Sequence, residues 1–185
     1  MDILAQSFAV LGKTIESFGL LLKNKLKMFI VIAIAGIGYV TSFLLLGSVV
    51  GAIANTITAG RYMSYYLIET HNPTKKKYGI AIILQISIIV TTVVLFWRNA
   101  YDLIIIVSVV LQAFGTAYKN TLVVRFVLII NNFLWFVFNF MLGAYINCGL
   151  EIIAMIAGSF GIIIHHYLPY FKIKRLNKIT GVNVK

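Results

Sequence analysis

The stretch FGLLLKNKLKMFIVIAIAGIGYVTSFLLLG, residues 18–47, recurs without a gap 96 positions later as FGTAYKNTLVVRFVLIINNFLWFVFNFMLG, residues 114–143. Nine aligned positions are identical, and they include the Phe-Gly start, a Lys-Asn pair and the Leu-Gly end. Matches of Leu, Ile and Val arise by chance in an apolar chain, but the glycines, the Lys-Asn pairs and the unbroken register are harder to obtain that way. The pattern predicts one membrane unit used twice, a plan that many transporters follow.

The composition indicates a membrane protein. Of the 185 residues, 61% are hydrophobic and only 11% are charged, and the mean hydropathy is +0.96. Soluble domains carry a charged share of about 25%. The length allows about six or seven spanning helices of roughly 20 residues each. The net charge of +11 gathers in short clusters between apolar runs, which is typical of cytoplasmic loops and unlike the basic face of a nucleic-acid-binding domain.

Seven apolar segments predict seven transmembrane helices, because none of them shows the alternation of barrel strands. They cover approximately residues 3–22, 28–46, 48–68, 78–97, 103–118, 126–142 and 144–168. A polar connector at 69–77 separates the third from the fourth, and Pro169 is expected to end the seventh. The Leu-Gly pairs at 46–47 and 142–143 predict two tight reversals.

Basic residues predict the orientation, since cytoplasmic loops are enriched in Lys and Arg. With the N-terminus outside and the C-terminus in the cytoplasm, thirteen basic residues lie inside, and of the loops outside only one contains a basic residue, Arg98. The thirteen are Lys23, Lys25, Lys27, Lys75, Lys76, Lys77, Lys119, Arg125, Lys172, Lys174, Arg175, Lys178 and Lys185. The basic tail, residues 170–185, is expected to lie on anionic lipid headgroups.

The repeat and the orientation together predict the architecture. Segments one to three match segments five to seven, and the fourth segment links them, so that both halves face the same way. We therefore expect a first three-helix bundle at 1–69, a connector and linker helix at 70–100, a second three-helix bundle at 101–169 and the tail at 170–185. The two bundles are related by an axis along the membrane normal.

Several short stretches resemble the YgjV family of bacterial inner membrane proteins, within the SWEET/PQ-loop transporter superfamily. They are FLLLGSVVGAIAN at 43–55, GR at 60–61, LWFVFN at 134–139, LGAY at 142–145 and GLE at 149–151. The resemblance implies the 3+1+3 helix plan, the bacterial cytoplasmic membrane and SWEET-like transport of a small solute. One feature departs from the superfamily. PQ-loop and SWEET proteins carry prolines in their helices, whereas the only prolines here, Pro73 and Pro169, lie outside the apolar cores.

In SWEET-like units the resemblance implies a pocket with an aromatic residue on the second helix and an Asn on the third. The repeat supplies Tyr39 with Asn55 in the first half, and aligns them with Trp135 and Glu151 in the second. Each lies about seven or eight residues from its Leu-Gly turn, or roughly 10–12 Å from the outer surface at about 1.5 Å per residue. We expect these four side chains to form a substrate site between the halves. The alternative is that the two aromatic residues serve packing alone.

Four charged residues fall inside the predicted helices, where charge is rare and often functional. Glu151 is a candidate ligand for an amine group or a coupling proton, and its alternative role is a structural pair with Lys13. Lys13 and Glu16 are i,i+3 neighbours and can pair on one helix. Glu16 and Arg61 have similar predicted depths, so we expect an ion pair between them, with a gate as the second interpretation.

Asn131, Asn132 and Asn139 are expected to line the pathway or to bond across helices. The sequence lacks a catalytic set, a cofactor motif and metal-ligand spacing around its histidines, so neither an enzyme nor a cofactor is expected. The leading hypothesis is transport of a small polar solute by alternating access, with an amine-bearing or zwitterionic solute favoured over a neutral sugar. The alternative is a non-transporting scaffold or receptor that retains the fold. The sequence is compatible with a homo-oligomer, and no nucleic-acid partner is expected.

Overall fold

The computed structural model describes residues 2–71, 73–96 and 99–171, and within these ranges the chain forms seven α-helices, one π-helical turn and no strand. The helices are α1 (Asp2–Leu21), α2 (Lys25–Leu45), α3 (Val49–His71), α4 (Lys75–Phe96), α5 (Asp102–Gly115), α6 (Thr121–Met141) and α7 (Tyr145–Ile162). Four stretches of the described chain are long and apolar enough to span a membrane: Lys25–Leu45, Lys75–Phe96, Thr121–Met141 and Tyr145–Phe171. The predicted all-α membrane class is thus confirmed. With 14 residues, α5 is only about 21 Å long.

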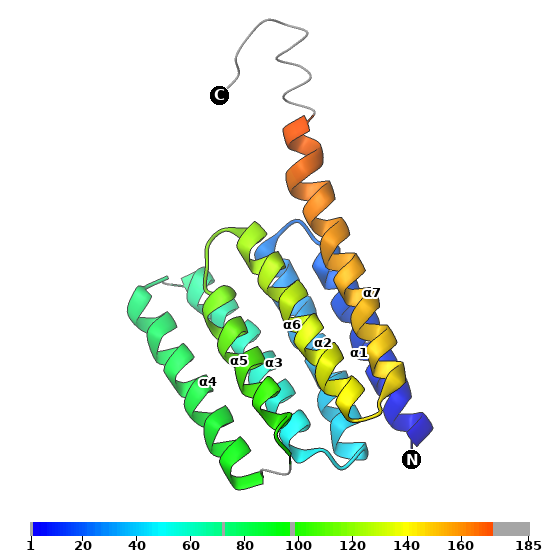
Figure 1. The fold of residues 1–185 in the computed structure, drawn as a ribbon. Coiled ribbons are helices and arrows are strands. Elements are labelled where there is room, and N and C mark those ends of the chain that lie inside the picture. Colours follow the sequence, from blue (N-terminus) through cyan, green and yellow to red (C-terminus); the bar gives the residue numbers. More distant parts are fainter. Residues whose placement is uncertain (1, 72, 97–98, 172–185) are drawn as a thin grey trace, which may run out of the picture.

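The helices form a closed ring in chain order. Each helix packs against the next, α7 returns to α1, and α3 also contacts α5. Figure 1 shows α5, α6 and α7 in front of α3, α2 and α1, with α4 at one edge. Each half is therefore a row of three helices with its second helix in the middle. The contact between α1 and α7 has its repeat counterpart in the contact between α5 and α3.

The bounds of the second helices and the starts of the third helices keep the 96-residue offset of the sequence repeat, whereas the bounds of α1 and α5 do not. The second helix of each half begins at Lys25 or Thr121, and the third begins at Val49 or Tyr145. The same offset therefore holds in the backbone, although most side chains differ between the halves.

Matching residues also begin and end the second helices. Asn24 and Asn120 cap the starts of α2 and α6, each accepting a hydrogen bond from the backbone N–H two residues later at 2.9 Å. Gly47 and Gly143 follow their ends, both at φ +72°, a conformation that favours glycine. We call the end of the molecule with these two glycines the turn end, and the end with the two asparagine caps the loop end.

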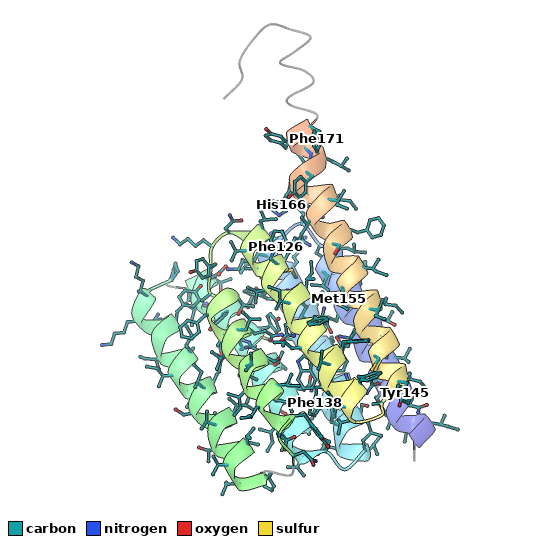
Figure 2. All side chains as sticks on the ribbon, viewed as in Figure 1. Phe126, Phe138, Tyr145, Met155, His166 and Phe171 are labelled. Carbon is teal, nitrogen blue, oxygen red and sulfur yellow. The ribbon has the colours of Figure 1, made fainter. Side chains whose placement is uncertain are left out.

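The seventh helix does not stop at Pro169, contrary to the prediction. The π-helical turn Ile163–Tyr167 follows α7, and helix then continues to Phe171. Proline collides with the carbonyl four residues earlier in a regular helix, and the wider turn just before Pro169 accommodates the ring. The segment projects beyond the loop end, where Figure 2 shows Phe171 well past Phe126 in α6. The tail cations from Lys172 onward, like Arg98, lie outside the described residues.

Most of the predicted polar connector at 69–77 is helical, because α3 runs to His71 and α4 begins at Lys75. Glu69 stays in the helix with its carboxylate bound to Lys25 of α2, the Oε1–Nζ distance being 2.5 Å. The third and fourth helices are therefore longer than their apolar segments.

Candidate functional site

A buried group of three charged side chains joins the two halves near the middle of the helices. The Lys13 ammonium on α1 binds Glu16 Oε2 at 2.9 Å and Glu151 Oε2 on α7 at 2.8 Å. The Tyr39 hydroxyl donates to the same Glu16 oxygen at 2.6 Å, and its ring centroid lies 5.1 Å from Lys13 Nζ. We call Lys13, Glu16 and Glu151 the charged triad. It holds two carboxylates and one ammonium in an environment where charge is costly.

Close packing of α1 on α2 brings these groups together. A Cβ atom on Gly38 would stand 2.9 Å from the Phe8 carbonyl oxygen, and one on Gly12 would stand 3.0 Å from the Ala35 carbonyl oxygen. Only glycine permits this approach of the two backbones. Tyr39, next to Gly38, thereby reaches Glu16.

A small cavity of about 40 Å³ lies beside the charged triad, with room for a few water molecules. All four predicted substrate-site residues border it, together with the triad and two of the three predicted pathway asparagines. In full, these predicted residues are Tyr39, Asn55, Trp135, Glu151, Lys13, Glu16, Asn131 and Asn132. The structure thus brings residues from both halves to one cavity, which we call the central cavity.

The side chains of the central cavity differ in how far their polar atoms are satisfied. Asn55 donates to the Gly51 carbonyl at 2.9 Å, and Asn131 accepts from Ser108 at 2.6 Å. Asn132 is fully buried, and its Nδ2 has no hydrogen-bond partner among the described residues. The ring of Trp135 packs against the ring of Phe43 from the other half, with 5.8 Å between the two ring centroids.

The expected ion pair between Glu16 and Arg61 is wrong. Arg61 donates to the Val109 carbonyl at 3.0 Å, to Thr58 Oγ1 at 2.8 Å and to Gln112 Oε1. Similar depth did not bring the two charges together, because Arg61 faces α5 whereas Glu16 faces α2 and Lys13. The buried guanidinium instead joins α3 to α5 through neutral oxygens.

Sequence reasoning missed three polar residues that border the central cavity: Thr58, Tyr62 and Gln112. Thr58 and Tyr62 follow Asn55 at i+3 and i+7, so they share its helix face. Gln112 is the repeat counterpart of Glu16, at an offset of 96. Helical spacing and the repeat register were the signals that could have identified them.

A larger cavity of about 300 Å³ opens at the turn end, and we call it the vestibule. Both Leu-Gly turns and the start of α5 border it, and its lining residues include Ser48, Asn99, Asp102, Asn139 and Asn147. A small cavity of about 10 Å³ shares Asn139 and Asn147 with the vestibule and shares Lys13, Tyr39 and Glu151 with the central cavity. The three cavities therefore lie in succession from the turn end to the charged triad.

Buried cations brace the loop end. Lys25 of α2 donates to the Tyr118 carbonyl after α5 at 2.7 Å. Arg125 of α6 donates to the Leu22 carbonyl after α1 at 2.5 Å, and also to the Leu20 carbonyl. Leu22 and Tyr118 are repeat counterparts, so each half holds the first loop of the other. We call these two contacts the cation braces.

Apolar cores separate these regions. One cluster near the turn end contains Phe43, Trp135 and Phe138, and another towards the loop end contains Phe29 and Leu128. The charged triad and the central cavity lie between them as a polar layer. Within the described ranges, no three His, Cys, Asp or Glu side chains lie close enough together to hold a metal ion.

Comparison with known proteins identifies the family. A family model named Imp-YgjV, described as bacterial inner membrane protein, matches residues 3–167. No curated protein and no solved structure matches the chain. The match covers all seven helices and every residue of the central cavity. The chain therefore belongs to the Imp-YgjV family of bacterial inner membrane proteins.

Proposed function

We propose that this protein moves a small polar solute across the bacterial inner membrane by alternating access, with the solute bound between the two halves. The observation that carries the proposal is the succession of three cavities from the turn end to the charged triad, combined with the cation braces at the loop end. An alternating-access transporter has a state in which its buried polar site is open to one side of the membrane and closed to the other. Cavities on the turn-end side of the site and braces on the loop-end side fit such a state.

The placement of the site between repeated units supports the same proposal. Substrate sites of transporters with internal repeats lie near the bilayer midplane at the repeat interface. Here the central cavity takes Lys13, Glu16 and Asn55 from the first half, and Trp135 and Glu151 from the second. A movement of one half against the other would change the shape of this cavity directly.

The proposal includes the 3+1+3 plan and the relationship to SWEET-like transporters. Reciprocal contacts of α1 with α7 and of α5 with α3 support a two-fold relationship between the halves, and α4 occupies the link position. It also includes an outside N-terminus, a cytoplasmic loop end, and a basic tail that binds anionic headgroups. Lys23, Lys27, Lys75–Lys77 and Lys119 all lie on the loop-end side, which supports this orientation.

The second candidate function is a non-transporting membrane scaffold or receptor. The direct bond between Lys13 and Glu151 favours it, because an ion pair between α1 and α7 can serve as a structural tie. The two candidates differ in whether the central cavity is ever reached from the loop end.

Cysteine accessibility separates them. In a Cys148→Ala parent, Asn55→Cys places a thiol in the central cavity, and Ile37→Cys provides a lipid-facing control on exposed helix surface. We expect a small membrane-impermeant methanethiosulfonate to modify Asn55→Cys when it is added to either side of sealed vesicles, and to leave Ile37→Cys unmodified. Modification from the turn-end side alone, or from neither side, supports the scaffold instead.

A further inference from the structure

The charged triad has the form of an occupied ammonium site. We propose that the transported solute is a small zwitterion, and that Lys13 occupies the subsite for its primary ammonium when no solute is bound. This inference rests on the proposed function and adds the class of the solute. It also assigns Lys13 a role as a tethered competitor for that subsite.

The acceptors around Lys13 Nζ are those that an ammonium group requires. Glu16 Oε2 and Glu151 Oε2 lie 2.9 Å and 2.8 Å away, the range of charge-assisted hydrogen bonds, and the Tyr39 ring lies at a cation–π distance of 5.1 Å. Two carboxyl groups share this one ammonium, so the triad has more acceptor oxygens than Lys13 uses.

Two buried donors among the residues that border the central cavity supply the second feature. Tyr62 and Asn132 both border the cavity and are both 1% exposed, and neither the Tyr62 hydroxyl nor Asn132 Nδ2 has a partner among the described residues. Buried donors without partners are rare and costly, so a ligand oxygen is their natural complement. Acceptors that bind an ammonium and donors that bind an oxyanion thus face one cavity.

A second buried cation, Arg61, lies beside Tyr62. Arg61 stands 5.7 Å from the Tyr62 ring, and its hydrogen-bond partners within the described chain are the neutral groups of Val109, Thr58 and Gln112. The positive charge of Arg61 therefore favours an anionic group near Tyr62. A zwitterion matches both ends, whereas a neutral sugar offers neither an ammonium to the carboxyl groups nor an oxyanion to Tyr62 and Arg61.

The position of Lys13 connects binding to motion. Lys13 and Glu16 are on the same helix, whereas Glu151 belongs to α7 of the other half. A solute ammonium that takes Glu151 releases the bond between the halves and leaves Lys13 paired with Glu16. Departure of Lys13 from its present place also enlarges a cavity that now measures about 40 Å³.

Thermal unfolding of the purified protein with β-alanine, propylammonium, propionate and propanol tests the inference. In the wild type we expect β-alanine to raise the unfolding temperature more than its three partial analogues, and Glu151→Gln to abolish the rise. Lys13→Ala removes the competitor and leaves space of its shape, so propylammonium should bind it roughly tenfold more tightly than the wild type, a difference of about 1.4 kcal/mol. Propanol should not, and Lys27→Ala should behave as the wild type.

Each outcome decides the question. If Lys13→Ala folds only when propylammonium is present during purification, that rescue supports the ammonium subsite. The inference is overturned if β-alanine does not raise the unfolding temperature of the wild type and propylammonium neither binds Lys13→Ala nor rescues its folding. The inference is also overturned if neutral polyols stabilise the protein and stabilise Glu151→Gln equally. In that case, labelling of Asn55→Cys from both sides of the vesicles would still support the proposed transport function.

Discussion

The two ends of this molecule have the same backbone plan but opposite interiors. At the turn end, Gly47 and Gly143 reverse the chain in the same conformation, and a cavity of about 300 Å³ lies between the halves. At the loop end, Asn24 and Asn120 cap equivalent helices, and buried cations fill the space between the halves. The repeated backbone therefore does not determine which end is open.

The difference arises at positions where the halves have diverged. Lys25, which holds the loop after α5, has Thr121 as its counterpart, and Arg125 has Phe29. At the turn end, Phe43 corresponds to Asn139, and both border the vestibule. A pseudo-symmetric frame thus carries asymmetric side chains, and charge-assisted bonds to backbone carbonyls keep one end together. Substitutions at these positions test which side chains keep the loop end closed.

The largest effect is expected at Arg125, which is fully buried. Arg125→Met deletes the bonds to the Leu20 and Leu22 carbonyls and should lower the free energy of unfolding by about 3 kcal/mol or more, since bonds to charged groups contribute about 1.5–3 kcal/mol each. Unfolding by denaturing detergent measures the loss. Labelling of Ala117→Cys at the loop end should rise in parallel, and an unchanged labelling rate would mean that this brace does not hold the end closed.

Lys25 and Lys27 form a matched pair in the first turn of α2. Lys25→Met removes the bonds to Glu69 and Tyr118 and should cost about 2 kcal/mol, because both bonds are only partly buried and Glu69 remains partly solvated. Lys27 is exposed, so Lys27→Met should change the unfolding free energy by less than about 0.5 kcal/mol. Equal effects in the same detergent titration would show that charge near the membrane surface matters and the brace does not.

Much of the fold was predictable because the repeat carries backbone information. The Leu-Gly pairs and the apolar segments predicted the reversals and the number of helices, whereas the helix caps at Asn24 and Asn120 were not predicted. The resemblance and the repeat together selected Tyr39, Asn55, Trp135 and Glu151 at equivalent depths. All four border the central cavity, and their role in substrate binding stays a prediction. These features depend on position along a helix, which sequence spacing records.

Features that depend on direction around a helix were not predictable in the same way. Arg61 and Glu16 agree in depth but face different neighbours, so depth alone suggested a false pair. Lys25 and Arg125 were counted with the loop cations, although both point inwards and bind carbonyls. The continuation past Pro169 depends on a π-helical turn for which the sequence carries no recognised signal.

Gly161 tests how tightly the Arg125 brace is fitted. A Cβ atom there would overlap the Arg125 guanidinium and stand 2.5 Å from the Leu20 carbonyl oxygen. Gly161→Ala should therefore cost about 1.5 kcal/mol, within the usual range for overpacking. Gly149→Ala on the same helix meets no atom within 4 Å and should be neutral or slightly stabilising. Detergent unfolding of the two variants compares them, and similar stabilities would show that Arg125 can move aside freely.

The smallest loss of stability is expected from substitutions of the two glycines at the turn end. A Cβ atom on Gly47 or Gly143 meets nothing within 4 Å, so the cost of Gly47→Ala or Gly143→Ala comes only from the left-handed backbone, about 1 kcal/mol each. Since the two turns are separate, the double variant should lose the sum in the same titration. Equal and additive losses mean that the turns are mechanically equivalent and that the vestibule owes its shape to side chains. A clearly larger loss at Gly47, which borders the vestibule, would instead place part of the asymmetry between the two ends in the backbone itself.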